Sequence, residues 1–325
     1  MRTAMILVAG AVAFWPLRLN AQQPTMPIIG VLNSTSVGLR DEQAVAFHSG
    51  LKQTGYVDKQ NVTIEYRWAD NQYDRLPGLA AELVKRGVSV IVASGGPTSA
   101  IAAKKVTTTV PIVFTTVADP IGYGLVASLN RPGGNLTGNA GLTSELDPKR
   151  LELLHQIKPS SGPIGVLINP NRPDGAMQMR EVHAAAKAVG RELLILSTAN
   201  DREIDAAFET LAQKKVDALL VTADAFFSSK RTQLIGLAAR YAIPTAYQWR
   251  EFTTAGGLMS YGPSVTEVYF QTGVFVGRIL KGAQPADLPV VVPSRFELVI
   301  NLKTAKALGL TVPRVLFSRA DELVE

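Results

Sequence analysis

Residues 88–120 read Val88-Ser-Val-Ile-Val-Ala-Ser94-Gly-Gly-Pro-Thr98 and, after a short helical run, Val110-Pro-Ile-Val-Phe-Thr115-Thr-Val-Ala-Asp119-Pro120. Both halves are apolar runs that stop at small and hydroxylated residues. Runs of β-branched residues without alternation are typical of strands covered on both faces, as in a parallel sheet between helices. Ligands bind at the carboxyl edge of such sheets, where small residues let them approach the backbone. The stretch predicts two parallel strands and half of a small-molecule site, although two ordinary strand–helix turns would leave the same pattern.

Composition narrows the class of protein. The chain has 325 residues, 46% hydrophobic and 18% charged, with a net charge of +6, and this length predicts about two domains. The basic residues are scattered, so no nucleic-acid partner is expected. The absence of cysteine excludes disulfides, thiolate metal sites and a lipid-attached cysteine. The three histidines lie far apart in sequence, and we therefore expect neither a metal site nor a cofactor.

The first residues have the pattern of a targeting segment. Arg2 precedes an apolar run over residues 4–15, and Ala21 is followed by a polar stretch. This pattern is typical of a secretory signal peptide, here residues 1–21. The run is shorter than the roughly 20 residues of a membrane span. We expect an exported periplasmic protein that is not inserted in the membrane after cleavage.

Strand and turn signals recur in the same order in both halves of the chain. Apolar runs begin near residues 26, 61, 88 and 110, and again near residues 162, 191, 216 and 243. Amphipathic helical patterns separate them, and such alternation favours a doubly wound sheet. The sequence predicts an α/β protein with two doubly wound parallel-sheet lobes, a hinge and a cleft between the lobes.

Three local signals suggest where the chain passes between lobes. Asp147 and Pro148 are expected to begin a helix, with Asp147 as its cap. Residues 256–262 form a short strand between glycines and a natural hinge. Ser264 and Glu267 form a capping box that opens the next helix. We predict residues 26–143 plus 255–285 as lobe 1 and residues 144–254 plus 286–325 as lobe 2; residues 121–129 are predicted to be helical.

Candidate ligand-binding residues follow the predicted strands. In the first lobe they are Ser34, Ser94, Gly95, Thr98, Thr115, Thr116 and Asp119. In the second lobe they are Asn169, Asn171, Thr222, Asp224, Tyr247 and Gln248. Hydroxyls and backbone N–H groups of the first set suit a carboxylate, and Asp119 suits an ammonium. Asp119 and Asp224 are alternatively turn or cap residues, and Tyr247 and Trp249 would either stack on an aromatic ligand or pack in the core.

Several segments together resemble a known family. They are Gly50-Leu-Lys-Gln-Thr-Gly-Tyr56, Ile64-Glu-Tyr-Arg-Trp68, Tyr73-Asp-Arg-Leu76, Pro111-Ile-Val-Phe114, Gly124-Leu-Val-Ala-Ser-Leu-Asn-Arg-Pro-Gly-Gly-Asn135, Lys149-Arg-Leu-Glu-Leu-Leu154 and Phe296-Glu-Leu-Val-Ile-Asn-Leu-Lys303. The chain resembles periplasmic substrate-binding components of uncharacterised ABC transport systems, with sheets of the branched-chain amino-acid receptor type (type 1 periplasmic binding fold). The resemblance implies two lobes joined by three crossings, a solute in the cleft, a membrane permease as partner, and amino acids as ligands of some relatives. The leader departs from the arginine run of many relatives, since only Arg2 is present, and this leaves the export route open.

We therefore expect an extracytoplasmic solute receptor for an amino acid or related carboxylate, and not an enzyme. A periplasmic hydrolase is an alternative, but the sequence contains no GxSxG motif, no phosphate-binding loop and no paired metal ligands. A ligand-sensing subunit for a membrane receptor is a second alternative that sequence does not separate from transport. A repressor of similar architecture would need a helix-turn-helix where the targeting segment stands.

Overall fold

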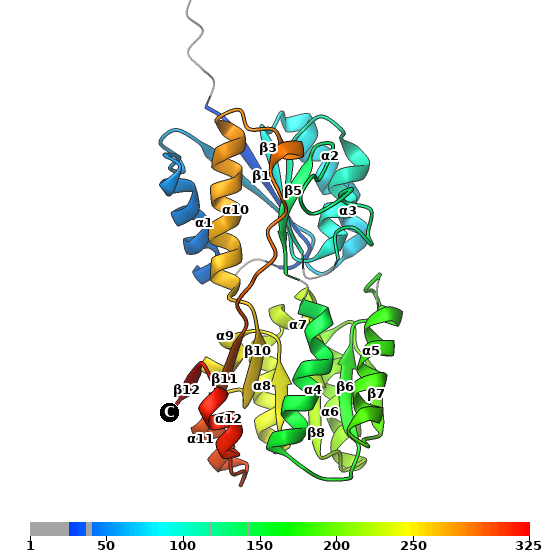
Figure 1. Ribbon diagram of the computed structural model, residues 1–325. Helices are drawn as coiled ribbons and strands as arrows, with labels where there is room; N and C mark the ends of the chain where they lie inside the picture. The colour runs from blue at the N-terminus through cyan, green and yellow to red at the C-terminus, as the bar shows by residue number, and fades with distance from the viewer. Residues whose placement is uncertain (1–25, 37–40, 117–118, 142, 174) are drawn as a thin grey trace, which may run out of the picture.

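The computed structural model describes residues 26–36, 41–116, 119–141, 143–173 and 175–325. Two α/β lobes, each built on its own sheet, lie one above the other (Figure 1). The predicted signal peptide, residues 1–21, lies outside the described residues. Among the helices of the described ranges, none is both long enough and apolar enough to cross a membrane.

The first lobe holds a parallel sheet in the order β2-β1-β3-β4-β5. Its strands are β1 (Ile28–Asn33), β2 (Thr63–Trp68), β3 (Val90–Ser94), β4 (Ile112–Thr116) and β5 (Leu136–Ala140). Helices α1 (Asp41–Gln53) and α10 (Val265–Leu280) cover one face, and α2 (Leu76–Arg86) and α3 (Pro97–Val106) cover the other (Figure 1).

The apolar run of β3 supplies both faces of this sheet. Val90 and Val92 pack toward α1 and α10, whereas Ile91 and Ala93 pack toward α2 and α3. Because both faces are covered, every position of the strand is buried and no polar alternation is needed. The uninterrupted run at residues 88–94 is therefore explained by its central place in the sheet.

The second lobe repeats this strand order and then extends it. Its sheet runs β12-β11-β10-β9-β8-β6-β7. The strands are β6 (Ile164–Ile168), β7 (Leu193–Ser197), β8 (Ala218–Val221), β9 (Thr245–Tyr247), β10 (Met259–Gly262), β11 (Glu297–Asn301) and β12 (Glu322–Val324). The order β7-β6-β8-β9-β10 matches β2-β1-β3-β4-β5, which confirms the predicted repetition. Strand β11 is antiparallel to β10, and β12, which the sequence analysis did not predict, pairs parallel to β11.

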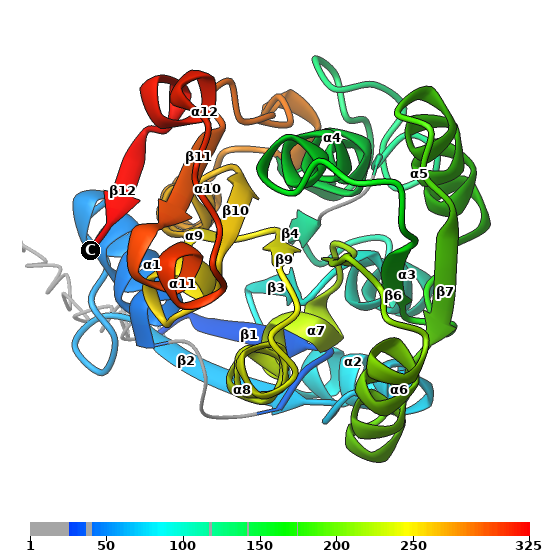
Figure 2. The ribbon, with the colours of Figure 1, turned by 90° about the horizontal axis from the view of Figure 1, so that it is seen from below.

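Helices cover both faces of the second sheet as well (Figure 2). One face carries α4 (Asp147–Ile157) and α5 (Gly175–Ala188), and the other carries α6 (Asp201–Gln213) and α8 (Arg231–Arg240). The shorter helices are α7 (Ala225–Ser229), α9 (Arg250–Thr254), α11 (Leu302–Ala307) and α12 (Arg314–Arg319). The described residues also include the 3₁₀ turns η1 (Tyr73–Arg75), η2 (Thr143–Leu146) and η3 (Pro285–Asp287). The described chain is therefore α/β in both lobes, with the core of each on the two faces of its sheet.

The chain crosses between the sheets three times, after β5, after β10 and before β11. Two predicted boundaries differ from this arrangement. Strand β10 pairs with β9 and β11 in the second sheet, whereas residues 255–262 were assigned to lobe 1. Val291 donates its N–H to Gly138 and accepts from the N–H of Ala140, so residues 286–291 accompany lobe 1 rather than lobe 2. A local strand pattern does not determine which other strand the segment pairs with. For this reason, the sequence alone assigned both segments to the wrong lobe.

Helix α10 returns from the second lobe to pack on α1. Ser264 accepts a hydrogen bond from the Glu267 N–H, as the predicted capping box requires. A Cβ on Gly273 would collide with the carbonyl of Phe47, and one on Gly50 would collide with that of Phe270. The glycines therefore allow the two helix backbones to approach, and α10 is held against lobe 1.

Two expected local structures are wrong. Residues 121–129 form turns and not a helix, because Gly122 and Gly124 weaken the helix and the Ile121 N–H donates to Asp119 Oδ1 at 2.9 Å. The cap of α4 is not Asp147, since Leu146 precedes the helix and makes no side-chain cap. The side chain of Asp147 is instead fully buried beside Arg150.

Candidate functional site

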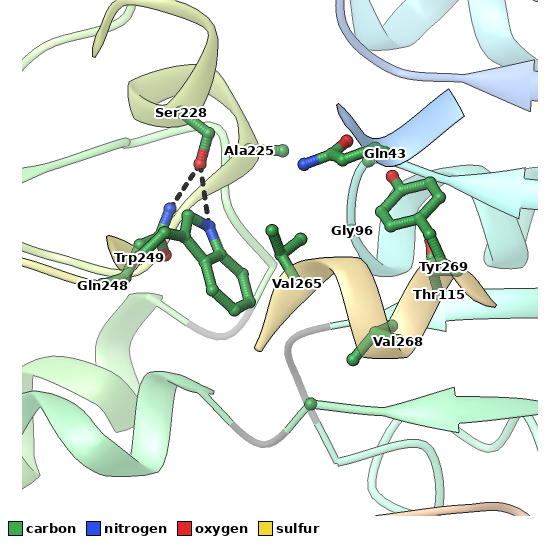
Figure 3. A pocket seen from close by; sticks show the side chains of 12 residues that line it. Gln43, Gly96, Thr115, Ala225, Ser228, Gln248, Trp249, Val265, Val268 and Tyr269 are labelled. Carbon is green, nitrogen blue, oxygen red and sulfur yellow. Dashed lines mark hydrogen bonds between the residues drawn. The ribbon is translucent and has the colours of Figure 1, made fainter. Parts of the chain in front are cut away.

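A pocket with a cavity volume of about 50 Å³ lies between the two lobes (Figure 3). It is lined by Gln43, Gly95, Gly96, Thr115, Gly141, Ala225, Ser228, Gln248, Trp249, Val265, Val268 and Tyr269. These residues come from the strand ends of lobe 1 and the start of α1, from α7 and the end of β9 in lobe 2, and from the start of α10. The predicted cleft is therefore present, and both sheets face it with their carboxyl edges, as open α/β sheets do.

On the lobe 1 side, the loop from β3 to α3 brings backbone to the pocket. Gly95 and Gly96 have φ angles of 84° and 102°, a region that favours glycine. Gly95 is also packed against Ser34. Its carbonyl accepts a hydrogen bond from Ser34 Oγ, and a Cβ on Gly95 would collide with Ser34 Oγ. Helix α3 begins at Pro97 with no side-chain cap, so its first N–H groups and positive dipole end remain available to an anion.

Two hydroxyls from neighbouring strands complete this side. Ser94 Oγ is hydrogen-bonded to the hydroxyl of Tyr269, which ties β3 to α10. Thr115 at the end of β4 is buried, and its Oγ1 has no hydrogen-bond partner among the described residues. A buried hydroxyl without a partner is unfavourable, so Thr115 suits a ligand that supplies one.

On the lobe 2 side, Gln248 and Trp249 follow β9 directly. The indole Nε1 of Trp249 donates to Ser228 Oγ at 3.2 Å, which fixes the ring along the pocket (Figure 3). Gln248 Nε2 donates to the carbonyl oxygen of Asp224 at 2.9 Å and to Ser228 Oγ. The remaining polar atom of the amide, Gln248 Oε1, is buried and has no partner among the described residues.

The described lining residues carry no formal charge. Val265 of α10 lies between Trp249 and Tyr269 (Figure 3), and Val268 also lines the pocket. The pocket therefore offers an aromatic and aliphatic wall with a few neutral dipoles, an arrangement common in small-molecule sites. Within the described ranges, no group of three His, Asp or Glu side chains is placed to hold a metal ion.

The predicted residues Asn169 and Asp224 lie together, but their polar atoms bind protein groups. Asp224 Oδ1 accepts from the Phe226 N–H at 2.8 Å and so caps α7, and it also accepts from Asn169 Nδ2 at 3.0 Å. Asp224 Oδ2 lies 3.7 Å from Arg172 Nη1. Asn169 Nδ2 further donates to the hydroxyl of Tyr73 from lobe 1 at 3.2 Å. Burial, with Asp224 nearby, raises the pKa of Tyr73, so its hydroxyl stays protonated.

The remaining predicted residues are dispersed. Asp119 borders a separate hollow with Tyr123 and Glu145, and Asn171 is exposed. The hydroxyl of Thr222 donates to the carbonyl of Leu167, and Tyr247 is buried against Phe252 with ring centroids 4.5 Å apart. Thr98 lies half-buried in the first turn of α3. Thr116 ends β4, and the structure does not describe its side chain. Of the predicted set, Gly95, Thr115 and Gln248 line the pocket, with Ser34 and Ser94 directly behind it.

Sequence reasoning missed the contribution of α10 and α1. Val265, Val268 and Tyr269 have the apolar spacing of an ordinary core helix, and only the crossing after β10 brings them to the cleft. Gln43 carries no local signal at all. Gly96 belongs to the run of small residues after the strand at residues 88–94, so it would have been included if every small residue at a strand end had been taken as a candidate. Ser228 lies in α7, several residues after the end of β8.

A protein-family comparison assigns the architecture. The family model described as ABC transporter substrate binding protein matches residues 29–324. The chain belongs to this family. This substrate-binding protein is also 29% identical over 285 residues to a "Tyrosine-binding protein" of Clostridioides difficile (strain R20291), covering 87% of this chain and 81% of that one.

Two solved structures bear on the arrangement of the lobes. One, the ABC domain in complex with L-Trp from Streptococcus pneumonia, is 27% identical with a TM-score of 0.81. The other, the ligand-free, open structure of a substrate binding protein with adhesive properties from Clostridium difficile, is 26% identical with a TM-score of 0.64. Each alignment covers 92% of this chain and 99% of the other. Since identity and coverage are nearly equal, the lower score is consistent with a different relation between the lobes, and this substrate-binding protein is closer to the complex.

Proposed function

We propose that this protein is an extracytoplasmic, periplasmic receptor that binds an amino acid or related small carboxylate and delivers it unchanged to the permease of an ABC transporter. The family match supports the receptor role. Two similar proteins, one named a tyrosine-binding protein and one solved in complex with L-Trp, support an amino acid as the ligand. The targeting pattern at residues 1–21 supports export.

One observation carries the proposal: a pocket whose walls come from both lobes and from the helix that joins them. A ligand there would contact both lobes at once, and such contacts favour the closed arrangement over the open one. This is the physical requirement for a receptor that traps and releases a solute.

The pocket also has two chemically distinct ends. The backbone at Gly95 and Gly96, with the uncapped start of α3, suits a carboxylate. Trp249 and the valines of α10 suit a large apolar or aromatic side chain, because offset stacking on an indole adds to the gain from burial. We therefore expect large neutral amino acids to bind better than small ones.

A calorimetric titration of the mature protein with the twenty L-amino acids tests this proposal. We expect binding of large neutral members and no turnover of the bound ligand. The variant Trp249→Ala should weaken their binding about tenfold or more, because it removes a large buried contact surface. Phe317→Ala, at an exposed position of α12, is the matched control and should bind as the wild type does. If no amino acid or small carboxylate binds, or if the bound compound is converted, the proposal is wrong.

A further inference from the structure

We infer that the amide oxygen of Gln248 accepts a hydrogen bond from the ligand's ammonium group, and that the pocket thereby selects zwitterions over carboxylates that lack an amino group. This inference rests on the proposed function, because it concerns the same pocket. It replaces the sequence-based assignment of the ammonium to Asp119, which borders a different hollow.

The orientation of the Gln248 amide is set by the protein. Its Nε2 donates to the carbonyl oxygen of Asp224 and to Ser228 Oγ. Turning the amide over would place Oε1 against that carbonyl, and two acceptors repel one another. The backbone of Asp224 therefore directs the oxygen away from itself and leaves it as the free polar atom of a residue that lines the pocket.

That oxygen is buried and unsatisfied in the described structure. Gln248 is only 2% exposed, and Oε1 has no hydrogen-bond partner. Thr115 Oγ1 across the pocket is buried and unpartnered as well, and so is Gln43 Oε1. A primary ammonium carries three donors and no acceptor, so it complements a set of acceptors contributed by both lobes.

The neutrality of the pocket makes this arrangement selective. The Asp224 carboxylate lies behind the wall and is engaged by Phe226, Asn169 and Arg172, and the described lining residues include no acid. A cation without a carboxylate would thus enter without a counter-charge, and burying such a charge is costly. A zwitterion brings its own counter-charge, and its ammonium satisfies acceptors that an acid lacking the amino group would leave unpaired.

Matched ligand pairs provide the test. L-Tyrosine is compared with 3-(4-hydroxyphenyl)propionate, and L-tryptophan with indole-3-propionate, by calorimetry. Each pair differs only in the α-amino group. We expect the wild type to prefer the amino acid by about 10- to 150-fold, the range of one hydrogen bond to a charged group. The variant Gln248→Met should bind the amino acid more weakly and so lose most of this preference, whereas its affinity for the propionate should change little.

A second variant keeps the test decisive if Gln248→Met does not fold. Thr115→Val is isosteric, removes only the opposing acceptor, and should reduce the same preference partially. Phe317→Ala should leave the preference intact. A preference that is unchanged in both pocket variants would overturn the inference. Equal wild-type affinity for both members of a pair would also overturn it, while leaving the proposed carboxylate receptor standing. A wild type that binds none of the four compounds would contradict both.

Discussion

Asp224 acts through its carboxylate and through its backbone carbonyl, and each has a different task. Its carboxylate caps α7 and accepts from Asn169, while its carbonyl holds the amide of Gln248. The residue was predicted to contact ligand directly. The structure instead places its polar atoms behind the pocket wall, where they orient a residue that lines it.

At the residue scale, the expectation that ligand-binding residues follow the ends of strands identified only part of the pocket. Thr115 and Gln248 follow buried strands, and the carboxyl ends of parallel strands meet at one edge. Tyr269 lies on a helix that enters from the other lobe, so its position depends on a crossing that no local pattern specifies. Asp119 follows β4 as predicted, but its carboxylate bonds the next turn. The position of a residue in the sequence therefore predicts which edge of the sheet it occupies, whereas competing backbone hydrogen bonds decide which side chains line the pocket.

Glu145 gives a pH-dependent prediction at this scale. Burial raises its pKa above the ordinary value, and Glu181 and Asp119 raise it further. A raised folded-state pKa means that the ionised carboxyl destabilises the folded state at neutral pH, and this penalty disappears below the unfolded-state pKa. Glu145→Gln should therefore raise the melting temperature at pH 7, with the gain vanishing near about pH 3.5.

The control for this prediction is Glu152→Gln. Glu152 pairs with Lys149 at 2.7 Å on a half-exposed surface, and such pairs contribute little. Thermal unfolding of the three proteins at both pH values makes the comparison. A lower melting temperature for Glu145→Gln at pH 7 would show that the repulsion is not present.

At the element scale, a buried ion pair joins two of the three crossings. Asp147 begins α4 just after the first crossing, and Arg150 Nη1 donates to its Oδ1 at 2.5 Å. Arg150 Nε also donates to the carbonyl of Tyr261 at 2.7 Å, near the end of β10 and the second crossing. Both side chains are fully buried. The pair thus fixes the start of α4 against β10, where the chain leaves for lobe 1.

Removing one member of this pair should be costly. Arg150→Met leaves the Asp147 carboxylate buried without its counter-charge, and we expect a loss of about 3–5 kcal/mol in the free energy of unfolding. The double variant Asp147→Asn with Arg150→Met should lose less than the sum of the two single variants, because the charge is removed with its partner. Urea unfolding of the four proteins measures both quantities. Additive losses would mean that the two side chains do not interact.

The order of elements was predictable, but their assignment to lobes was not. Hydrophobic periodicity and glycine stops located the strands of both repeats, since those signals are local. Strand β10 and residues 286–291 carry equally clear extended patterns, yet each pairs with the other sheet from the one expected. The hydrogen-bond partners of an extended segment are determined by long-range packing, and a local sequence pattern contains no information about that packing.

At the scale of the whole molecule, contacts outside the pocket also join the lobes. The Tyr73 hydroxyl accepts from Asn169 Nδ2 at 3.2 Å, and Asn71 Nδ2 donates to Ser229 Oγ at 3.5 Å. Asp70 and Asn71 have φ angles of 55° and 62°, a left-handed turn held by N–H bonds to Thr35 and Ser34. The turn presents lobe 1 side chains to lobe 2, and the contacts require the lobes to be close.

Tyr73→Phe should therefore lower ligand affinity without touching the ligand. Loss of one hydrogen bond that favours the closed arrangement corresponds to a decrease of about two- to tenfold. Calorimetry measures this, and small-angle X-ray scattering of the liganded protein should show a larger population of open molecules. Tyr66→Phe, on the half-exposed edge strand β2, is the control. Equal affinity in Tyr73→Phe and wild type would mean that the contact does not contribute to closure.

The segment that follows η3 limits how far the two lobes can move apart. It is hydrogen-bonded along β5 up to Val291 and resumes pairing at β11 from Glu297, so only residues 292–296 lie between the two attachments. The six residue steps from Val291 to Glu297 extend to about 22 Å at most. This segment is therefore one of three short tethers between the lobes, which can swing apart but cannot separate. A protease cut within these five residues would leave the crossings after β5 and β10 intact, so it would widen the range of opening without removing a contact from the pocket.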